Sequence, residues 1–301
     1  MKLLLLTIFT ILCLFNQIHA RVTSARASES DITYVFYSRD YFDGIYVHIN
    51  DSSINHIMDV FKVSKPTVIL IHGFKDGFEA DSNTYVRKAI LSKLNANVIK
   101  VDWRPLADQN YLVARNAVPY VGAFAASFLS SLSAQFQYSL TNVTLVGFSL
   151  GAHIAGNIGR NTDTPIGYIM ALDPAGPLIE SDVSVRPSDA DYVQSIHTNG
   201  GVLGMVNAVG HSDFYPNGGS RQPGCGSDIL GGCSHNRAWE FFAESLTNNK
   251  FVSQKCNSWD EYRNHLCHGE TRLMGGLNTV DKLAKGVYYL ETNDQSPYGR
   301  G

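Results

Sequence analysis

One segment, from Val143 to Gly159, limits the possible folds of this chain more than any other. The apolar run Val143–Val146 leads into Gly147-Phe148-Ser149-Leu150-Gly151, and helix-forming residues follow. Glycine is needed two residues either side of the serine when a strand turns so tightly into a helix that a side chain there would collide with its neighbours. Such a turn exposes the serine hydroxyl above the helix amino terminus. The segment predicts a nucleophile at Ser149, and an ordinary glycine-rich turn is the alternative.

Elsewhere the chain alternates between strand-like and helix-like segments. Short β-rich runs occur at Thr33–Tyr37, Thr67–Ile71, Asn97–Val101, Val143–Val146 and Gly167–Leu172. Helical composition occurs between them at Asp81–Leu94, Tyr111–Leu132 and Leu150–Gly159. Several of the strand-like runs are apolar on successive residues, as strands buried on both faces are. The pattern predicts an α/β fold with a mostly parallel central sheet and helices on both faces, with reactive groups in loops at the carboxyl ends of the strands.

A serine nucleophile needs a histidine to take its proton and a carboxylate to orient that histidine. In this fold the chain order is serine, acid, histidine. Asp173 ends the run Gly167–Leu172 and lies 24 residues after Ser149, in a loop stiffened by Pro174, Gly176 and Pro177. Asp173 is therefore the predicted acid, and a turn-forming aspartate before proline is the alternative.

The chain order leaves five candidate bases, His197, His211, His235, His265 and His268. His235 is the predicted base, because it follows Cys233 by two residues and precedes the amphipathic, helix-like stretch Ala238–Leu246. His197 ends an apolar run and is interpreted as a structural histidine.

An acyl-transfer intermediate carries an oxyanion that needs two preorganised N–H donors. The backbone N–H of Leu150, directly after the nucleophile, is the first predicted donor. The second is the backbone N–H of Phe74, in the segment Ile71-His72-Gly73-Phe74 that ends an early strand.

The first twenty residues predict an export signal. They contain Lys2, a thirteen-residue apolar run from Leu3 to Phe15, and a small residue, Ala20, at which cleavage could occur. Thirteen residues fall short of the roughly 20 that span a bilayer. We expect no later stretch long and apolar enough to span. Residues 21–30 are interpreted as a short extension or propeptide, and residues 31–301 as a single catalytic domain.

The cysteines and sequons also suit an exported chain. The cysteines beyond the signal are Cys225, Cys233, Cys256 and Cys267. Their even number predicts two disulfides, with three pairings open. A metal site at Cys225, Cys233 and His235 is disfavoured, because zinc sites usually start from cysteines two to four residues apart. Asn50 and Asn142 begin N-glycosylation sequons.

Charge excludes some classes of partner. Without the signal, 23 basic side chains face 27 acidic ones. There is no cluster of lysine and arginine of the kind that binds nucleic acid, and no polybasic run to hold the chain on an anionic membrane. We expect a monomer that touches lipid peripherally.

Taken together, these residues resemble the pancreatic lipase family, and more narrowly its insect phospholipase A1 branch, from about Tyr34 to Pro297. The motifs that carry the resemblance are Ile71-His72-Gly73-Phe74, Val101-Asp102-Trp103-Arg104, Gly147 to His153, Leu172 to Pro177, Ile196-His197-Thr198, Gln222 to Cys225 and Cys233-Ser234-His235. The resemblance implies an α/β-hydrolase fold, the triad Ser149, Asp173 and His235, and the oxyanion donors Phe74 and Leu150. It also implies the pairs Cys225–Cys233 and Cys256–Cys267.

Three departures from that family bear on substrate. Between Cys225 and Cys233 the long lid typical of triacylglycerol lipases is replaced by seven residues, Gly226, Ser227, Asp228, Ile229, Leu230, Gly231 and Gly232. Ile229 and Leu230 are candidate lipid anchors, with packing under a loop as the alternative. The family's C-terminal β-sandwich domain is not expected. The acidic calcium-loop positions of some relatives are not recognisable between Glu180 and Asp191, so neither a metal nor a cofactor is predicted.

The predicted function is hydrolysis of the sn-1 ester of phospholipids through an acyl-enzyme on Ser149. A triacylglycerol or galactolipid lipase is the alternative within enzymes. A lipid-binding or yolk-type carrier is the alternative from another class, disfavoured because carriers of this family lack one or more triad residues.

Overall fold

The computed structural model describes residues 27–47, 54, 57–278 and 280–301. The predicted signal, residues 21–26 of the predicted extension and the Asn50 sequon lie outside these ranges. The strands are β1 (Thr33–Tyr37), β2 (Ile45–Val47), β3 (Thr67–Ile71), β4 (Asn97–Asp102), β5 (Val143–Phe148), β6 (Tyr168–Leu172), β7 (Val193–Ile196), β8 (Ser212–Pro216), β9 (Val252–Lys255), β10 (Thr271–Leu273) and β11 (Gly286–Leu290). The α-helices are α2 (Asp81–Lys93), α3 (Arg104–Ala107), α4 (Tyr111–Phe136), α5 (Leu150–Arg160), α6 (Gly232–Thr247) and α7 (Trp259–Arg263).

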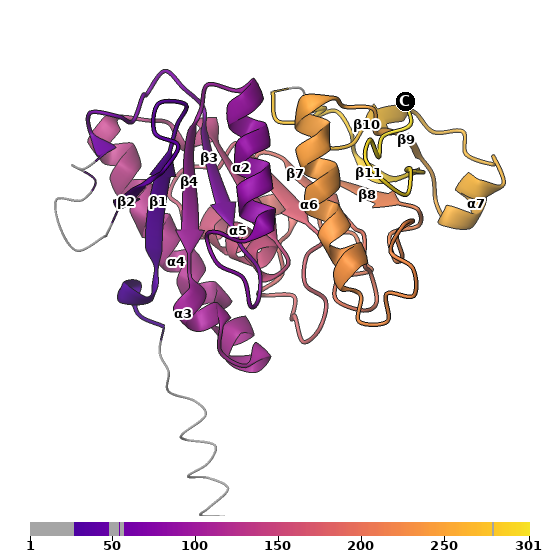
Figure 1. Ribbon diagram of the computed structural model, residues 1–301, viewed down its shortest axis with the longest axis horizontal. Coiled ribbons are helices and arrows are strands. Elements are labelled where there is room, and N and C mark those ends of the chain that lie inside the picture. Colours follow the sequence, from indigo (N-terminus) through magenta and orange to yellow (C-terminus); the bar gives the residue numbers. More distant parts are fainter. Residues whose placement is uncertain (1–26, 48–53, 55–56, 279) are drawn as a thin grey trace, which may run out of the picture.

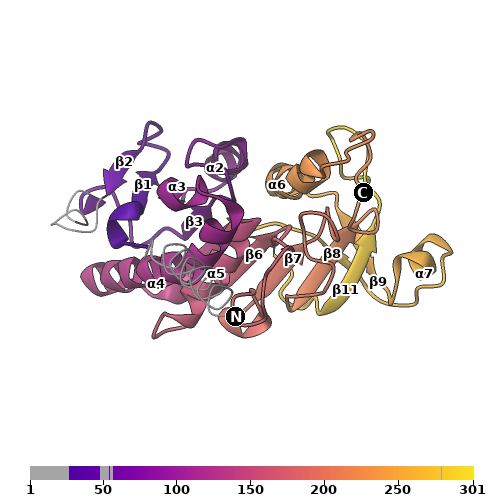
Figure 2. The ribbon, with the colours of Figure 1, turned by 90° about the horizontal axis from the view of Figure 1, so that it is seen from below.

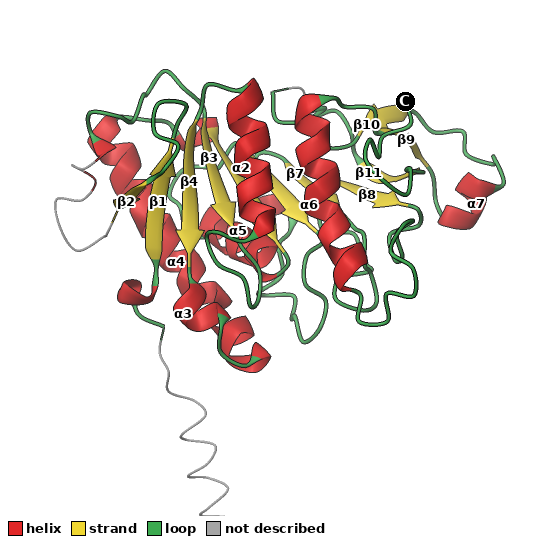
Figure 3. Cartoon of the chain, viewed as in Figure 1, coloured by secondary structure: helices red, strands yellow, loops and turns green. Residues whose placement is uncertain are grey.

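These strands form one sheet in the order β10-β9-β11-β8-β7-β6-β5-β3-β4-β1-β2. From β4 to β11 every neighbouring pair is parallel. The sheet ends in antiparallel pairs, with β1 and β2 at one edge and β9 and β10 at the other (Figure 3). The mostly parallel sheet predicted from the apolar runs is therefore confirmed.

Helices cover both faces of the sheet (Figures 1 and 2). Ile69 and Ile71 of β3 join the core cluster that contains α4 and α5. Val68 and Leu70, the alternate residues of the same strand, join the cluster that contains α2 and α6. Because successive side chains of a strand point to opposite faces, an unbroken apolar run fills both clusters. The predicted α/β-hydrolase fold is confirmed.

Most predicted element bounds hold to within two residues, and two differ more. Helix α4 continues to Phe136, four residues beyond the predicted end. Helix α6 begins at Gly232 rather than near Ala238, so His235 lies inside its first turn. The Asp228 carboxylate explains the earlier start, since it accepts hydrogen bonds from the N–H groups of Cys233 (3.2 Å) and Ser234 (2.7 Å). A carboxylate at a helix amino terminus satisfies N–H groups that have no partner within the helix.

Helix α4 corrects a second expectation. It is 26 residues long, with a mean hydropathy of 1.3 over its most apolar window, enough by length and composition to cross a membrane. The expectation that no later stretch would pass that test is wrong. However, half of that window is buried in the molecule. Gly122 of α4 lies so close to α5 that an added Cβ would be 2.4 Å from the Asn157 Cβ. Packing in the core accounts for the apolar composition of α4.

Candidate active site

Ser149, the predicted nucleophile, lies in the sharp turn between β5 and α5. Its backbone has φ 56° and ψ −120°, and its N–H donates to the Leu172 carbonyl of β6 at 3.0 Å. A Cβ on Gly147 would lie 2.2 Å from the Gly151 carbonyl oxygen, and a Cβ on Gly151 would lie 2.3 Å from that of Ile71. The two flanking glycines are therefore required by backbone contacts, for the reason that the sequence motif suggested.

Asp173 and His235 meet beside this turn. Asp173 follows β6 directly, is fully buried, and has a positive φ of 38°. Its Oδ2 lies 2.5 Å from His235 Nδ1. Its Oδ1 accepts the N–H groups of Thr198 (2.7 Å) and Asn199 (3.0 Å). Three N–H donors around one carboxylate keep it in the acceptor form and fix its orientation, as a triad acid requires.

The serine and the histidine come from neighbouring elements without a direct hydrogen bond. The His235 ring packs against Phe148, the residue before the nucleophile, with 4.5 Å between ring centroids. Among the described residues, the His235 ring is hydrogen-bonded through Nδ1, and no hydrogen bond joins its Nε2 to the Ser149 hydroxyl. Nδ1 is bound to Asp173, so Nε2 is the nitrogen left to accept a proton. Catalytic hydrogen bonds are often loose before substrate binds.

The predicted oxyanion donors lie on both sides of the serine. A Cβ on Gly73 would be 2.9 Å from the Ser149 Cβ, so the loop that carries Phe74 passes directly against the nucleophile. Leu150 is the first residue of α5, where N–H groups have no acceptor within the helix. Among the described residues neither of these two N–H groups donates to the protein. Both are available to an oxyanion.

A buried histidine and tryptophan hold the Phe74 loop in place. The Trp103 indole N–H donates to the His72 carbonyl at 2.9 Å, and the Trp103 backbone N–H donates to His72 Nε2 at 3.1 Å. His72 Nδ1 lies 2.9 Å from the Gly73 carbonyl oxygen, and its Nε2 also lies 3.3 Å from Asp102 Oδ1. Both residues lie within sequence motifs of this chain, but no feature of the sequence indicates that they brace the Phe74 loop.

The two disulfides implied by the resemblance, Cys225–Cys233 and Cys256–Cys267, are present. The predicted lid residues lie between the first pair, except that Gly232 is already the first residue of α6. Ile229 and Leu230 are 82% and 83% exposed, so they do not pack under a loop. Cys225, Asp228 and Cys233 are the one grouping of metal-ligand types found within the described ranges. Because their sulfurs are joined, the two cysteines offer no thiolate ligand.

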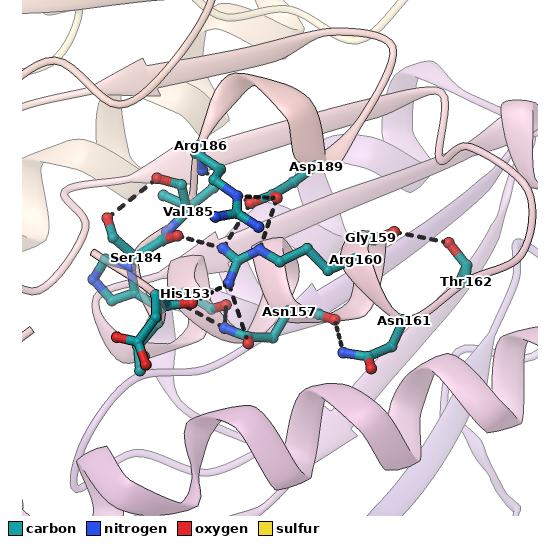
Figure 4. Close-up of polar contacts among 12 residues, drawn as sticks. His153, Asn157, Gly159, Arg160, Asn161, Thr162, Ser184, Val185, Arg186 and Asp189 are labelled. Carbon is teal, nitrogen blue, oxygen red and sulfur yellow. Dashed lines mark hydrogen bonds and ion pairs between the residues drawn. The ribbon is translucent and has the colours of Figure 1, made fainter. Parts of the chain in front are cut away.

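Helix α5 is tied to the loop that follows Asp173 (Figure 4). Arg160 pairs with the buried Asp189 through Nε (2.8 Å) and Nη2 (2.9 Å), and Nη1 donates to the Asp182 carbonyl at 2.6 Å. The guanidinium also donates to the Ser184 carbonyl. The buried Asp189 carboxylate lies in the segment from Glu180 to Asp191. It is therefore paired with the Arg160 guanidinium of the same chain.

His153, also on α5, makes a second tie. Its Nε2 lies 2.8 Å from the Ala175 carbonyl oxygen, and its Nδ1 accepts the Val185 N–H at 3.1 Å. Complete burial lowers the pKa of His153 to about 4, so the ring is neutral near pH 7 and donates through Nε2. The first turns of α5 therefore hold both the predicted nucleophile and the loop after the predicted acid.

Comparisons with known proteins identify the family of this chain. The model of the Lipase family matches residues 14–298. Pancreatic triacylglycerol lipases of Cavia porcellus and Homo sapiens are each 34% identical, covering 83% and 80% of this chain and 61% and 59% of their own lengths. A lipoprotein lipase of Neovison vison is 34% identical over 79% of this chain and 57% of its own.

This chain thus spans about three fifths of the length of these relatives. Among solved structures, esterase PE8 is 22% identical, covers 47% of this chain and 73% of its own, and has a TM-score of 0.36, a likeness too partial to bear on function. With a family match that covers most of its length, the chain belongs to the lipase family.

Proposed function

We propose that this protein is a secreted phospholipase A1. In the proposed reaction His235 Nε2 removes the proton of Ser149, whose oxygen attacks the sn-1 carbonyl carbon of a phospholipid. The backbone N–H groups of Phe74 and Leu150 bind the oxyanion, and Asp173 stabilises the imidazolium. The imidazolium then protonates the leaving glycerol oxygen, and lysophospholipid departs. Water, activated by His235, hydrolyses the acyl-enzyme to fatty acid and restores Ser149.

The short lid is the observation that supports phospholipid over triacylglycerol. The Cα atoms of Cys225 and Cys233 lie 5.6 Å apart, so the seven residues between them can reach outward by at most about 14 Å. Asp228 anchors the middle of that loop to the start of α6. A loop this short and anchored cannot form a long lid, which favours a site that admits a bulky, charged head group, although Ser149 itself is buried at 8% exposure.

Exposed apolar side chains near the site support docking on a lipid surface. Leu178 and Val206 are 66% and 63% exposed. Their loops are joined next to Asp173, because the Gly176 N–H donates to Leu203 and the Met205 N–H donates to Pro174, both at 2.8 Å. The lid lies against the loop that leads to Val206, since a Cβ on Gly231 would be 2.4 Å from Asn199 Oδ1. We therefore group Leu178, Val206, Ile229 and Leu230 as one exposed apolar surface, here named the Leu178–Leu230 rim. Such a rim favours contact with a membrane or micelle.

The alternatives to phospholipid hydrolysis at this site are the hydrolysis of other lipid esters and lipid binding without catalysis. The pancreatic triacylglycerol lipase relatives favour triacylglycerol as substrate, and a galactolipid would meet the same chemistry. A lipid carrier without activity is disfavoured by the assembled Asp173–His235 pair.

Export is supported by the two disulfides, which persist in oxidising compartments.

The test uses phosphatidylcholine labelled differently at its two acyl positions, with triacylglycerol as a parallel substrate. Wild type, Ser149→Ala and the control Ser227→Ala are compared; Ser227 is an exposed lid serine. We expect release of the sn-1 chain by wild type and Ser227→Ala, and loss of at least about 1,000-fold in Ser149→Ala.

Preferential sn-2 release, or faster cleavage of triacylglycerol than of phosphatidylcholine, would refute phospholipase A1 while leaving a lipase. An absence of hydrolysis with every lipid ester would favour the carrier.

A further inference from the structure

His197 and Asp213 form a buried histidine–carboxylate pair that is separate from the Asp173–His235 pair. His197 Nε2 is 2.9 Å from Asp213 Oδ1, and both side chains are fully buried, at 0% and 1% exposure. The His197 ring stacks on Tyr215 at 4.4 Å between centroids and an angle of 4°. Neither residue touches Ser149 or His235 in the described contacts, so the reaction itself assigns the pair no role.

The hydrogen bonds of His197 require a proton on both ring nitrogens. Nδ1 lies 3.0 Å from the Met205 carbonyl oxygen, which can only accept. On the other side, Asp213 Oδ1 already accepts the N–H groups of Val209 (2.8 Å) and Gly210 (3.2 Å). An oxygen surrounded by N–H donors carries no proton to give, so His197 Nε2 must donate as well. The pair is therefore a buried imidazolium and carboxylate.

The His197 imidazolium holds together the two ends of the loop 197–205, which surrounds the Asp173 carboxylate. His197 begins the loop, and Met205, whose carbonyl it holds, ends it. Between them, the N–H groups of Thr198 and Asn199 donate to Asp173 Oδ1. Gly204 passes so close that an added Cβ would lie 2.5 Å from the same oxygen. Holding the two ends of the loop together fixes the donors that orient Asp173.

We propose that His197 and Asp213 are positioning residues for catalysis, acting through the loop 197–205 on Asp173 and hence on His235. The charge on the pair matters, because a neutral His197 could hold Met205 or Asp213 but not both. The proposal rests on ester hydrolysis by the Ser149 triad and is independent of which lipid is cleaved.

The first experiment needs no active-site variant. The full protein is labelled with ¹⁵N-histidine, and the His197 ring signals are identified by their loss in His197→Gln. We expect two protonated ring nitrogens at neutral pH. A His197 ring with one unprotonated nitrogen would overturn the proposal. This result does not depend on whether the Asp213→Asn variant folds.

The second experiment removes the charge and keeps the shape, with Asp213→Asn. Hydrolysis of a soluble p-nitrophenyl ester is measured, so that lipid preference does not enter. We expect kcat to fall by about 10- to 100-fold while KM changes less than about two-fold, because the triad is misaligned and the binding of substrate is not. The downfield proton of the His235–Asp173 hydrogen bond should shift or disappear.

His211→Asn is the matched control. His211 lies two residues before Asp213, and its Nδ1 accepts the Val193 N–H at 3.0 Å, with no contact to the loop 197–205. We expect wild-type kcat and an unchanged downfield proton. A folded Asp213→Asn with kcat within about two-fold of wild type would overturn the positioning role. A wild type that cleaves the soluble ester but not sn-1 phospholipid would refute phospholipase A1 alone.

Discussion

At Ser149 the chain adopts a backbone conformation that side chains usually avoid, with φ at 56°. Sparsely populated backbone conformations of this kind cost about 1–3 kcal/mol and persist where the surroundings enforce them. The surroundings here are backbone atoms of β3, β6 and α5, which pack against the turn because Gly147 and Gly151 have no side chains.

Gly151→Ala should therefore disrupt the site. Its Cβ would lie 2.3 Å from the Ile71 carbonyl oxygen and 2.7 Å from that of His72, and neither backbone atom can rotate away. We expect a loss of about 2–3 kcal/mol in urea unfolding and loss of esterase activity. Gly232→Ala is the control, because no atom lies within 4 Å of the added Cβ and the site opens a helix. Normal activity in Gly151→Ala would contradict the steric argument.

Because His153 is buried in its neutral form, we expect the free energy of unfolding to decrease at acid pH. Burial lowers its pKa from 6.5 in the unfolded chain to about 4 in the folded protein. The unfolded state therefore binds a proton first, and the free energy of unfolding falls as the pH drops from 6.5 toward 4. His153→Gln can keep a donor and an acceptor but cannot titrate. Between pH 7.5 and 4.5 we expect wild type to lose about 2–3 kcal/mol more than this variant in urea unfolding. Parallel losses would contradict the assignment.

Residue identities were predictable where the chemistry demands a particular side chain. Ser149, Asp173 and His235 were proposed from a motif, a chain order and a neighbouring cysteine, and the structure brings Asp173 and His235 together beside the Ser149 turn. The groups that orient Asp173 were not predictable, because they are the backbone N–H groups of Thr198 and Asn199, which any residue could supply. The Asp213 partner of His197 also carried no signal, since only the pairing of β7 with β8 brings them together.

Among the elements, α5 links the predicted nucleophile to the loop after Asp173 through Arg160 and Asp189. Glycines let that loop approach the helix, since a Cβ on Gly159 would lie 1.9 Å from the Asp189 carbonyl oxygen. The Arg160 and Asp189 side chains are 15% and 0% exposed, so removing the arginine leaves a buried carboxylate with Arg186 as its remaining cation.

Arg160→Met should lower stability by about 3 kcal/mol, because a buried charge left without its main partner is strongly unfavourable. Arg300→Met is the control. Arg300 pairs with Glu291, and both side chains are about half exposed (51% and 50%), so we expect a loss below about 1 kcal/mol. Chemical unfolding at pH 7.5 measures both. Equal losses would contradict a structural role for the Arg160 pair.

The ends of helices and strands were predictable where the spacing of apolar residues changes. They were less predictable where a polar side chain caps a helix. Strands β1 and β3 match their predicted runs because both faces of each are buried. The start of α6 was missed by six residues, since the capping carboxylate of Asp228 lies in a segment that reads as a loop. The antiparallel edges of the sheet were likewise not apparent, because strand direction depends on connections that composition does not specify.

For the molecule on a lipid surface, a substitution in the Leu178–Leu230 rim should weaken lipid binding without changing catalysis. Leu230 is 83% exposed in a short loop beside His235, and burying a leucine in an apolar phase contributes about 1.5–3 kcal/mol. Leu230→Asp removes that contribution and adds a charge that lipid disfavours. We expect activity on phosphatidylcholine vesicles to fall by about 10- to 100-fold, with kcat/KM on a soluble ester unchanged.

Leu266→Asp is the matched control for a general effect of surface charge. Leu266 is 60% exposed and follows the end of α7 by three residues. Helix α7 lies beside the C-terminal strands at one end of the molecule (Figure 2). Vesicle co-sedimentation measures binding directly, and Leu266→Asp should bind as wild type does. If both variants lose vesicle activity equally, the rim is not the docking surface. If Leu230→Asp loses activity on the soluble ester as well, Leu230 acts on the triad itself, because a residue that only contacts the lipid surface cannot change the rate with a substrate that has none.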